Sequence, residues 1–159
     1  MQAFEFSVRA KSIQIPTWML LLLFLVYALP GNIGHAPWRG EDVLNIQVSY
    51  DILKNAQWLT PKLAGLSYID RGPLSYWFGA LTGMSLSWIL PVHDAIRFSS
   101  VLALGLQLLF LRSCARNLYG QDAGTATLLL MLGTLGLLVH AHEMQPLLIL
   151  TTCMAANLY

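Results

Sequence analysis

Residues 18–29 read WMLLLLFLVYAL, and this stretch determines the class of protein to which the chain belongs. It lies in the apolar run 16–33, and no Asp, Glu, Lys or Arg occurs anywhere in 12–38. About 18–20 apolar residues cross the ~30 Å hydrocarbon core of a bilayer, so the run is long enough for a membrane helix. The alternative is a cleaved signal peptide. We favour an uncleaved helix, because Pro30 and Pro37 follow the two candidate cleavage sites.

The composition of the chain also indicates a membrane protein. Of 159 residues, 56% are hydrophobic and 11% are charged, against roughly 25% charged in an ordinary soluble domain. The formal net charge of +1 excludes a nucleic-acid-binding protein that works through a basic face. Cys114 and Cys153 are too few for a disulfide scaffold and lack the spacing of metal ligands. Eight of the 17 charged residues lie in 39–71, so we expect an all-α integral membrane protein with one polar segment.

Further apolar runs follow the polar segment, and the last of them extends to the end of the sequence. We expect membrane helices over 16–33, 95–111, 123–140 and 146–159, with a large external loop over 34–94 between the first two. Because the sequence is still apolar at residue 159, we expect 1–159 to be the truncated N-terminal portion of one membrane domain.

The orientation of these helices follows from Lys and Arg in short loops, which favour the cytoplasmic side. The two basic residues just before the first run place the N-terminus in the cytoplasm. The run 73–91 either crosses the bilayer or lies along it as an interfacial or re-entrant segment. If it crosses, Arg112 and Arg116 fall outside, against the rule. We therefore favour the interfacial arrangement, which also places Glu143 on the same side as the polar segment.

An amphipathic helix is predicted over 41–55, at the membrane surface. Its apolar positions recur at helical spacing: Val43, Ile46, Tyr50 and Leu53. Glu41 and Asp42 fall in its first turn, where acidic residues favour the positive end of the helix dipole. The functional alternative is a catalytic pair, since acids held near lipid are costly and tend to be functional.

Asp70 and Arg71 follow the helix as the chain returns to the bilayer. They could pair with each other or with solvent. The functional alternative is that Arg71 binds a phosphate, because the planar guanidinium binds phosphate oxygens in a bidentate manner.

An ordered set of motifs connects these residues to a known family: 37–42 (PWRGED), 58–61 (WLTP), Gly65, Tyr68, Asp70-Arg71 and 76–77 (YW). The set resembles the membrane glycosyltransferases of family 39, which include protein O-mannosyltransferases and lipid A aminoarabinose transferases. Such enzymes place a Trp-x-x-Pro motif about seventeen residues after the first acid, and Glu41 and Trp58 are 17 residues apart here. The resemblance implies a GT-C fold whose first external loop carries amphipathic juxtamembrane helices.

The resemblance also implies an activity, the transfer of a hexosyl or pentosyl group from a polyprenyl-phosphate donor to a hydroxyl or phosphate acceptor. Glu41 takes the position of the general base and Asp42 that of its companion. Asp70 matches the acid of the third motif, and Arg71 matches the basic residue at the donor phosphate. The order Glu-Asp at 41–42 departs from the family, in which Asp-Glu is more frequent.

A second acidic site is expected in the segment 140–146, which reads HAHEMQP. Glu143 is the candidate catalytic residue of this site, with His142 and Gln145 as neighbours. The alternative is a polar loop whose histidines bind nothing. A zinc site from His140, His142 and Glu143 is disfavoured, because histidines two residues apart on a helix point away from each other. We expect no metal site, although a divalent cation remains compatible as a cofactor.

The resemblance also implies the binding partners and the cellular location of the enzyme. The partners would be a polyprenyl-phosphate sugar donor, a lipid, glycan or protein acceptor, and membrane lipid, with no nucleic acid. The location would be the bacterial inner membrane, with a cytoplasmic N-terminus and a periplasmic active-site loop. The alternative is a non-enzymatic polytopic membrane protein, such as a transporter fragment or an assembly factor. That class predicts acids within the apolar runs, whereas here they lie in loops. We expect the isolated chain to be incomplete and inactive.

Overall fold

The computed structural model describes residues 15–34, 36–37, 40–68 and 71–159 of the chain. This part of the chain is mostly helical, with one two-stranded antiparallel hairpin. The helices are α1 (Thr17–Ala28), α2 (Gly40–Asn55), α3 (Leu74–Leu86), α4 (Val92–Tyr119), α5 (Gln121–Leu132), α6 (Leu135–His140) and α7 (Pro146–Leu158), and the strands are β1 (Lys62–Leu63) and β2 (Leu66–Ser67).

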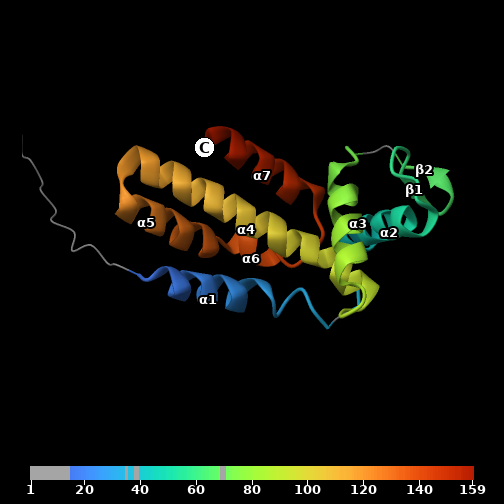
Figure 1. The fold of residues 1–159 in the computed structure, drawn as a ribbon, viewed down its shortest axis with the longest axis horizontal. Helices are drawn as coiled ribbons and strands as arrows, with labels where there is room; N and C mark the ends of the chain where they lie inside the picture. The colour runs from blue at the N-terminus through green and yellow to red at the C-terminus, as the bar shows by residue number, and fades with distance from the viewer. Residues whose placement is uncertain (1–14, 35, 38–39, 69–70) are drawn as a thin grey trace, which may run out of the picture.

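The helices form a bundle with a cap at one end (Figure 1). Helices α1, α4, α5 and α7 run along the long axis and alternate in direction as the chain proceeds. Helices α2 and α3 and the β-hairpin gather at the end where α4 and α7 begin, and α3 runs across the bundle rather than along it. The cap therefore holds most of the polar segment.

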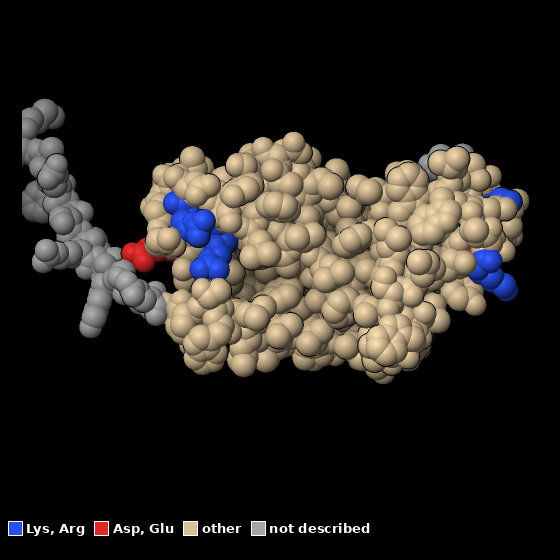
Figure 2. Space-filling model, in the orientation of Figure 1, with Lys and Arg blue, Asp and Glu red and all other residues tan. Residues whose placement is uncertain are grey.

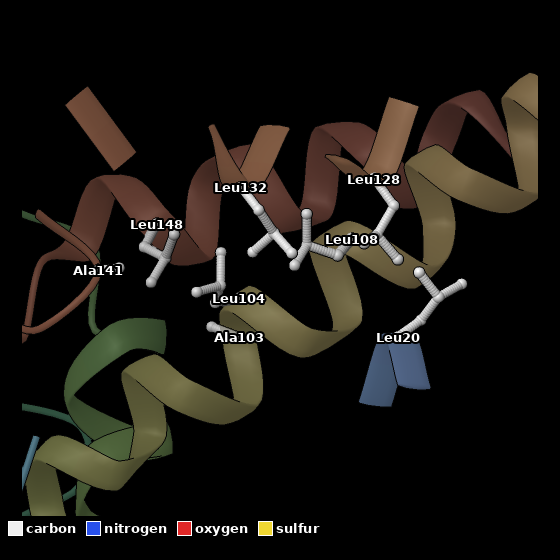
Figure 3. Packing of buried hydrophobic residues seen from close by; sticks show 8 residues of the cluster. All are labelled: Leu20, Ala103, Leu104, Leu108, Leu128, Leu132, Ala141 and Leu148. Atoms are coloured by element: carbon white, nitrogen blue, oxygen red, sulfur yellow. The ribbon is translucent and has the colours of Figure 1, made fainter. Parts of the chain in front are cut away.

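The bundle is held together by aliphatic side chains that meet between α4 and its neighbours (Figure 3). The buried members of this cluster are Leu20, Ala103, Leu104, Leu108, Leu128, Leu132, Ala141 and Leu148. Outside the cluster, α1 exposes large apolar side chains such as Trp18, Leu21 and Val26. An apolar surface of this kind is unfavourable in water and typical of a helix that contacts lipid.

The cap has a second apolar cluster of its own. Its buried members come from α2, α3, α4 and the loop before α7: Ile46, Val48, Ile52, Tyr76, Ala80, Ile96 and Met144. Helix α3 lies close to its neighbours at Gly83, where an added Cβ would come within 2.8 Å of both Ile96 Cγ1 and Leu53 Cδ1. This packing fixes α2 against the start of α4.

Within the described residues, α4 is the one helix that is long and apolar enough to cross a membrane, and α1 and α7 are shorter apolar helices. The 28 residues of α4 extend about 42 Å at 1.5 Å per residue, more than the ~30 Å of a hydrocarbon core. On the face drawn in Figure 2, charged side chains lie at the two ends of the molecule, and the middle carries none. This distribution is compatible with an all-α membrane protein.

The observed helix bounds differ from the expected ones at three places. The helix expected over 16–33 ends at Ala28, because Pro30 has no backbone N–H to continue the helical hydrogen bonds and its ring clashes with the preceding turn. The helix expected over 95–111 begins at Val92, directly after Pro91, and continues to Tyr119.

The third difference lies in the helix expected over 123–140, which is divided into α5 and α6. The break falls at Gly133 and Thr134. Gly is a poor helix former, and the Thr134 hydroxyl donates to the Met131 carbonyl at 2.6 Å, which offers the backbone an alternative to the helix.

The β-hairpin is a further departure from the all-α expectation. Its two strands pair Lys62 with Ser67 and Leu63 with Leu66. The turn between them needs two residues with positive φ, and these are Ala64 at 51° and Gly65 at 85°. The hairpin follows α2, and Leu63 packs against the apolar cluster of the cap.

Candidate functional site

Glu41 and Arg71 meet at the surface of the cap, although 30 residues separate them in the sequence. Glu41 lies in the first turn of α2, and Arg71 lies just before α3. The Arg71 Nη1 and Nη2 atoms lie 2.8 Å and 3.0 Å from Glu41 Oε2 and Oε1, so the pair is bidentate. The hydrogen bond to Glu41 raises the pKa of Arg71 above its ordinary value. This hydrogen bond favours the charged guanidinium, which an arginine carries throughout the physiological pH range.

A pocket of about 630 Å³ lies beside this ion pair, between the cap and α7. Its polar side chains are Glu41, Arg71, Ser75 and Gln145. The rest of its lining is apolar or small and comes mainly from α7: Gly72, Leu74, Pro146, Leu147, Ile149, Leu150 and Cys153. A cation and an aliphatic wall in the same pocket suit a ligand that has an anionic head and an apolar tail.

Asp42 lies next to Glu41 in the sequence but points into the protein. Its side chain is completely buried and forms an ion pair with the equally buried Arg97, at 2.7 Å between Oδ2 and Nη2. Its other oxygen, Oδ1, accepts a hydrogen bond of 2.8 Å from the backbone N–H of Met144. Asp42 therefore joins α2, α4 and the loop before α7.

Arg97 also contacts a second buried acid, Asp94, one turn earlier in α4. The distance from Arg97 Nη1 to Asp94 Oδ1 is 3.3 Å. Asp94 Oδ2 accepts a hydrogen bond of 3.0 Å from the Gly34 N–H in the segment after α1. A guanidinium bridges two carboxylates in this network, which satisfies charges that burial would otherwise make very costly.

The segment after α6 brings its polar residues to the same end of the molecule. The Glu143 carboxylate is 5% exposed and lies 3.6 Å from His140 Nδ1. It accepts a hydrogen bond of 2.9 Å from Gln145 Nε2, and Gln145 lines the pocket. His142 has turned away toward α1, where its Nε2 lies 2.9 Å from the Tyr27 carbonyl.

The structure therefore brings some of the predicted site residues together at one pocket and places others elsewhere. Glu41, Arg71 and Gln145 line one pocket. The carboxylate of Glu143 accepts a hydrogen bond from Gln145 and is not among the described residues that line the pocket. Asp42 and His142 contact protein groups elsewhere. Asp70 lies outside the described residues.

Two residues of the buried network were not predicted as part of the site. Neither Asp94 nor Arg97 was among the candidate site residues that the sequence nominates. A signal was nevertheless present in the sequence: an Asp and an Arg three positions apart share one face of a helix. Such a pair at the start of an apolar run is typical of charges that must satisfy each other.

In the part of the chain that the structure describes, no group of three or more His, Cys, Asp and Glu side chains is placed to hold a metal ion. His140 and His142 contact different partners, a carboxylate and a backbone carbonyl. The candidate site is thus built from an ion pair, an amide and an apolar wall.

The sequence of the chain is similar to those of several known transferases. The sequence is 28% identical over 121 residues to the undecaprenyl phosphate-alpha-4-amino-4-deoxy-L-arabinose arabinosyl transferase of Serratia proteamaculans, covering 72% of this chain and 21% of that protein. For the proteins of the same name from Yersinia enterocolitica and Pseudomonas aeruginosa, the identities are 31% over 94 residues and 28% over 124 residues. These alignments cover 57% and 77% of this chain, and 16% and 22% of the two relatives.

The chain is homologous to these arabinosyl transferases. It spans about a fifth of the length of the relatives, at modest identity. The resemblance to lipid A aminoarabinose transferases, which the motifs indicated, is thereby confirmed. No family model matches the chain, and no solved structure matches it.

Proposed function

We propose that this chain is the donor-binding portion of a membrane glycosyltransferase with a GT-C-type domain. The enzyme takes a sugar from a polyprenyl-phosphate donor and transfers it to a hydroxyl or phosphate acceptor at the external face of the inner membrane. The observation that carries the proposal is the pocket of about 630 Å³, which is lined by the Glu41–Arg71 pair and by the aliphatic side chains of α7. The homologous transferases are named for an undecaprenyl-phosphate-linked pentose, which favours a pentosyl donor.

The donor fits the pocket through its two chemically different parts. Its phosphate carries negative charge, and Arg71 offers a planar fork of donors that matches phosphate oxygens. Its prenyl chain is a hydrocarbon, and Leu147 and Leu150 of α7 present apolar surface next to the pocket. Burial of hydrocarbon contributes about 25 cal/mol per Å², so the tail supplies affinity while Arg71 orients the reacting end.

The residues also supply the parts of an inverting displacement. The acceptor oxygen attacks the anomeric carbon of the sugar, and the bond from that carbon to the phosphate oxygen breaks. The electron pair of that bond leaves with the polyprenyl phosphate, whose charge Arg71 offsets. When the acceptor is a hydroxyl, its proton passes to the Glu41 carboxylate, which acts as the general base. A phosphate acceptor is already anionic and needs no such step.

The ion pair between Glu41 and Arg71 requires the donor to bind before the base becomes available. Before the donor binds, both oxygens of Glu41 accept hydrogen bonds from Arg71. A donor phosphate at Arg71 replaces the Glu41 carboxylate and releases it toward the acceptor. The base thus becomes available only when the leaving group is in place.

The remaining nominated residues have supporting roles in this proposal. Gln145 faces the pocket, and its amide is held by the buried Glu143, so this pair is suited to orient the sugar or the acceptor. Asp70 precedes Arg71 and is proposed to act beside it. Asp42 acts as the companion of Glu41 from within the protein, and His142 holds the loop of Glu143 against α1.

The direct test is sugar transfer by membranes that contain the complete natural protein. The substrate is a panel of undecaprenyl phosphates that carry radiolabelled pentoses or hexoses. We expect one of these donors to be consumed, and we expect Glu41→Gln to slow transfer to a hydroxyl acceptor by about 10²–10⁴-fold, because a general base is lost.

The matched control is Asp51→Asn, which makes the same kind of change in the same helix. Asp51 accepts a hydrogen bond of 2.9 Å from Asn55, outside the pocket. The Asp51→Asn variant should transfer the sugar at a rate within twofold of the wild type. Full activity of Glu41→Gln would exclude Glu41 as the base, and no transfer from any polyprenyl phosphate would exclude the donor class.

A further inference from the structure

We propose that Arg97 is a positioning residue, which sets the separation of Glu41 and Gln145 across the pocket without touching the substrate. The inference rests on the proposed function for its catalytic consequence. Its structural part, the fixing of the start of α2 to the loop before α7 by one buried guanidinium, stands on the geometry of the cap. Arg97 is completely buried and is not among the described residues that line the pocket.

The first step is the connection between the two sides of the pocket. Asp42 Oδ2 pairs with Arg97 Nη2 at 2.7 Å, and Asp42 Oδ1 accepts the Met144 N–H at 2.8 Å. The carboxylate can meet the Met144 N–H only while it is held in this rotation, and the guanidinium holds it there. Asn45 adds a parallel hydrogen bond of 2.7 Å to the Met144 carbonyl.

The second step is sequence adjacency. Glu41 directly precedes Asp42, and Gln145 directly follows Met144. Both neighbours line the pocket. The buried contact between Asp42 and Met144 is therefore one residue away from each of two polar groups that face the substrate, so a shift of this contact shifts both.

The third step explains why the residue is an arginine. Its Nη2 reaches Asp42, and its Nη1 lies 3.3 Å from Asp94, which in turn accepts the Gly34 N–H. A planar guanidinium serves both carboxylates at once, whereas the single ammonium of lysine is a point charge on a flexible stem. Arg97→Lys therefore keeps the positive charge but loses the planar fork that contacts Asp42 and Asp94 at the same time.

The experiment compares Arg97→Lys with the wild type in the complete protein, by hydrogen exchange and by kinetics. In hydrogen exchange, we expect the backbone amides around Met144 and in the first turn of α2 to exchange at least tenfold faster in the variant. In kinetics with the undecaprenyl-phosphate sugar that the wild type consumes, we expect kcat to fall about 10–100-fold, since misplacement by 1 Å can cost 10² in rate. The KM for the donor should stay within twofold, because Arg71 still binds the phosphate.

The control for a merely structural role is Leu104→Ala, which removes buried packing from the same helix. It should lower the yield of folded protein and leave kcat per folded molecule and exchange at Met144 unchanged. If Arg97→Lys does not fold, Asp94→Asn removes the second partner of Arg97 and should give smaller changes of the same kind.

Two results would overturn the inference. The first is unchanged exchange at Met144 in these network variants. The second is faster exchange with an unchanged kcat. If the wild type consumes no polyprenyl-phosphate sugar, the proposed function fails, and the exchange measurement alone decides whether Arg97 fixes the start of α2 to the loop before α7.

Discussion

Arg71 in the cap and Arg97 at the start of α4 form ion pairs of very different strength. Arg71 and Glu41 have side chains that are 39% and 53% exposed, and an exposed pair of this kind contributes about 0–1 kcal/mol. Arg97 and Asp42 are both completely buried, and removal of one partner of such a pair costs about 3–5 kcal/mol. A phosphate can therefore replace Glu41 at Arg71 at little cost, whereas Arg97 cannot leave Asp42. The exposed pair is suited to bind and release, and the buried pair is suited to hold the site in place.

Gln145 adds a neutral amide to the pocket beside the Glu41–Arg71 ion pair. Its side-chain amide donates to Glu143 at 2.9 Å and lies 2.9 Å from His140 Nδ1. Two contacts on one nitrogen leave the amide little rotational freedom. A fixed, neutral amide is suited to the role proposed for it, the orientation of a sugar hydroxyl, and it adds no charge to the pocket.

At the scale of elements, α3 controls how closely α2 approaches α4. Gly83 provides the space, because a Cβ at this position would come within 2.8 Å of Ile96 Cγ1 and Leu53 Cδ1. We expect Gly83→Ala to destabilise the protein by about 1–3 kcal/mol, the usual cost of overpacking. Urea unfolding in detergent, followed by tryptophan fluorescence, measures the change.

Gly136→Ala in α6 is the matched control, since no described atom lies within 4 Å of a Cβ built there. It should be neutral or stabilising by up to about 1 kcal/mol, because Ala is the better helix former. Equal stability of the two variants would contradict the close packing of α3.

Much of the element order is visible in the sequence, because apolar runs and periodicity are local properties. The predicted helix 41–55 and the observed α2 differ by one residue at the start. The break between α5 and α6 was not predicted, since the apolar run passes through Gly133 and Thr134 without a charge or proline. The β-hairpin was missed because its strands have two residues each, too few for an alternating pattern.

At the scale of the whole molecule, the uncharged middle separates the cap from the end that carries Arg112 and Arg116 in α4. We predict that the cap is external and that this other end is cytoplasmic. Cysteines introduced at Lys54 and His140, both exposed at the cap, should react with a membrane-impermeant maleimide in intact spheroplasts. A cysteine at Leu118, exposed at the other end, should react only after permeabilisation.

The natural residues Cys114 and Cys153 are replaced by serine in this experiment. Labelling of Leu118→Cys in intact spheroplasts would reverse the orientation. Labelling of His140→Cys only from the cytoplasm would place the Glu143 segment on the wrong side for a shared site.

Which residues meet in the site is also a property of the whole molecule, and this limits what the sequence alone can predict. Glu41 and Arg71 could be nominated because each lies in a motif of the family. Their pairing required the hairpin and the start of α3 to fold back on α2. The burial of Asp42 could not be predicted, because it depends on Arg97 and Met144, which lie 55 and 102 residues away.

The central claim is that Arg71 binds a polyprenyl phosphate in competition with Glu41. The most direct measurement is the affinity of the purified complete protein for undecaprenyl phosphate in detergent micelles, by isothermal titration calorimetry. Arg71→Gln should weaken binding by about 10–100-fold, as expected for a charged hydrogen bond of about 1.5–3 kcal/mol. The exposed Lys54→Gln should have no effect, and Glu41→Gln should strengthen binding, because the competitor for the guanidinium is weakened. Equal affinities of the wild type and Arg71→Gln, or weaker binding in Glu41→Gln, would contradict the account.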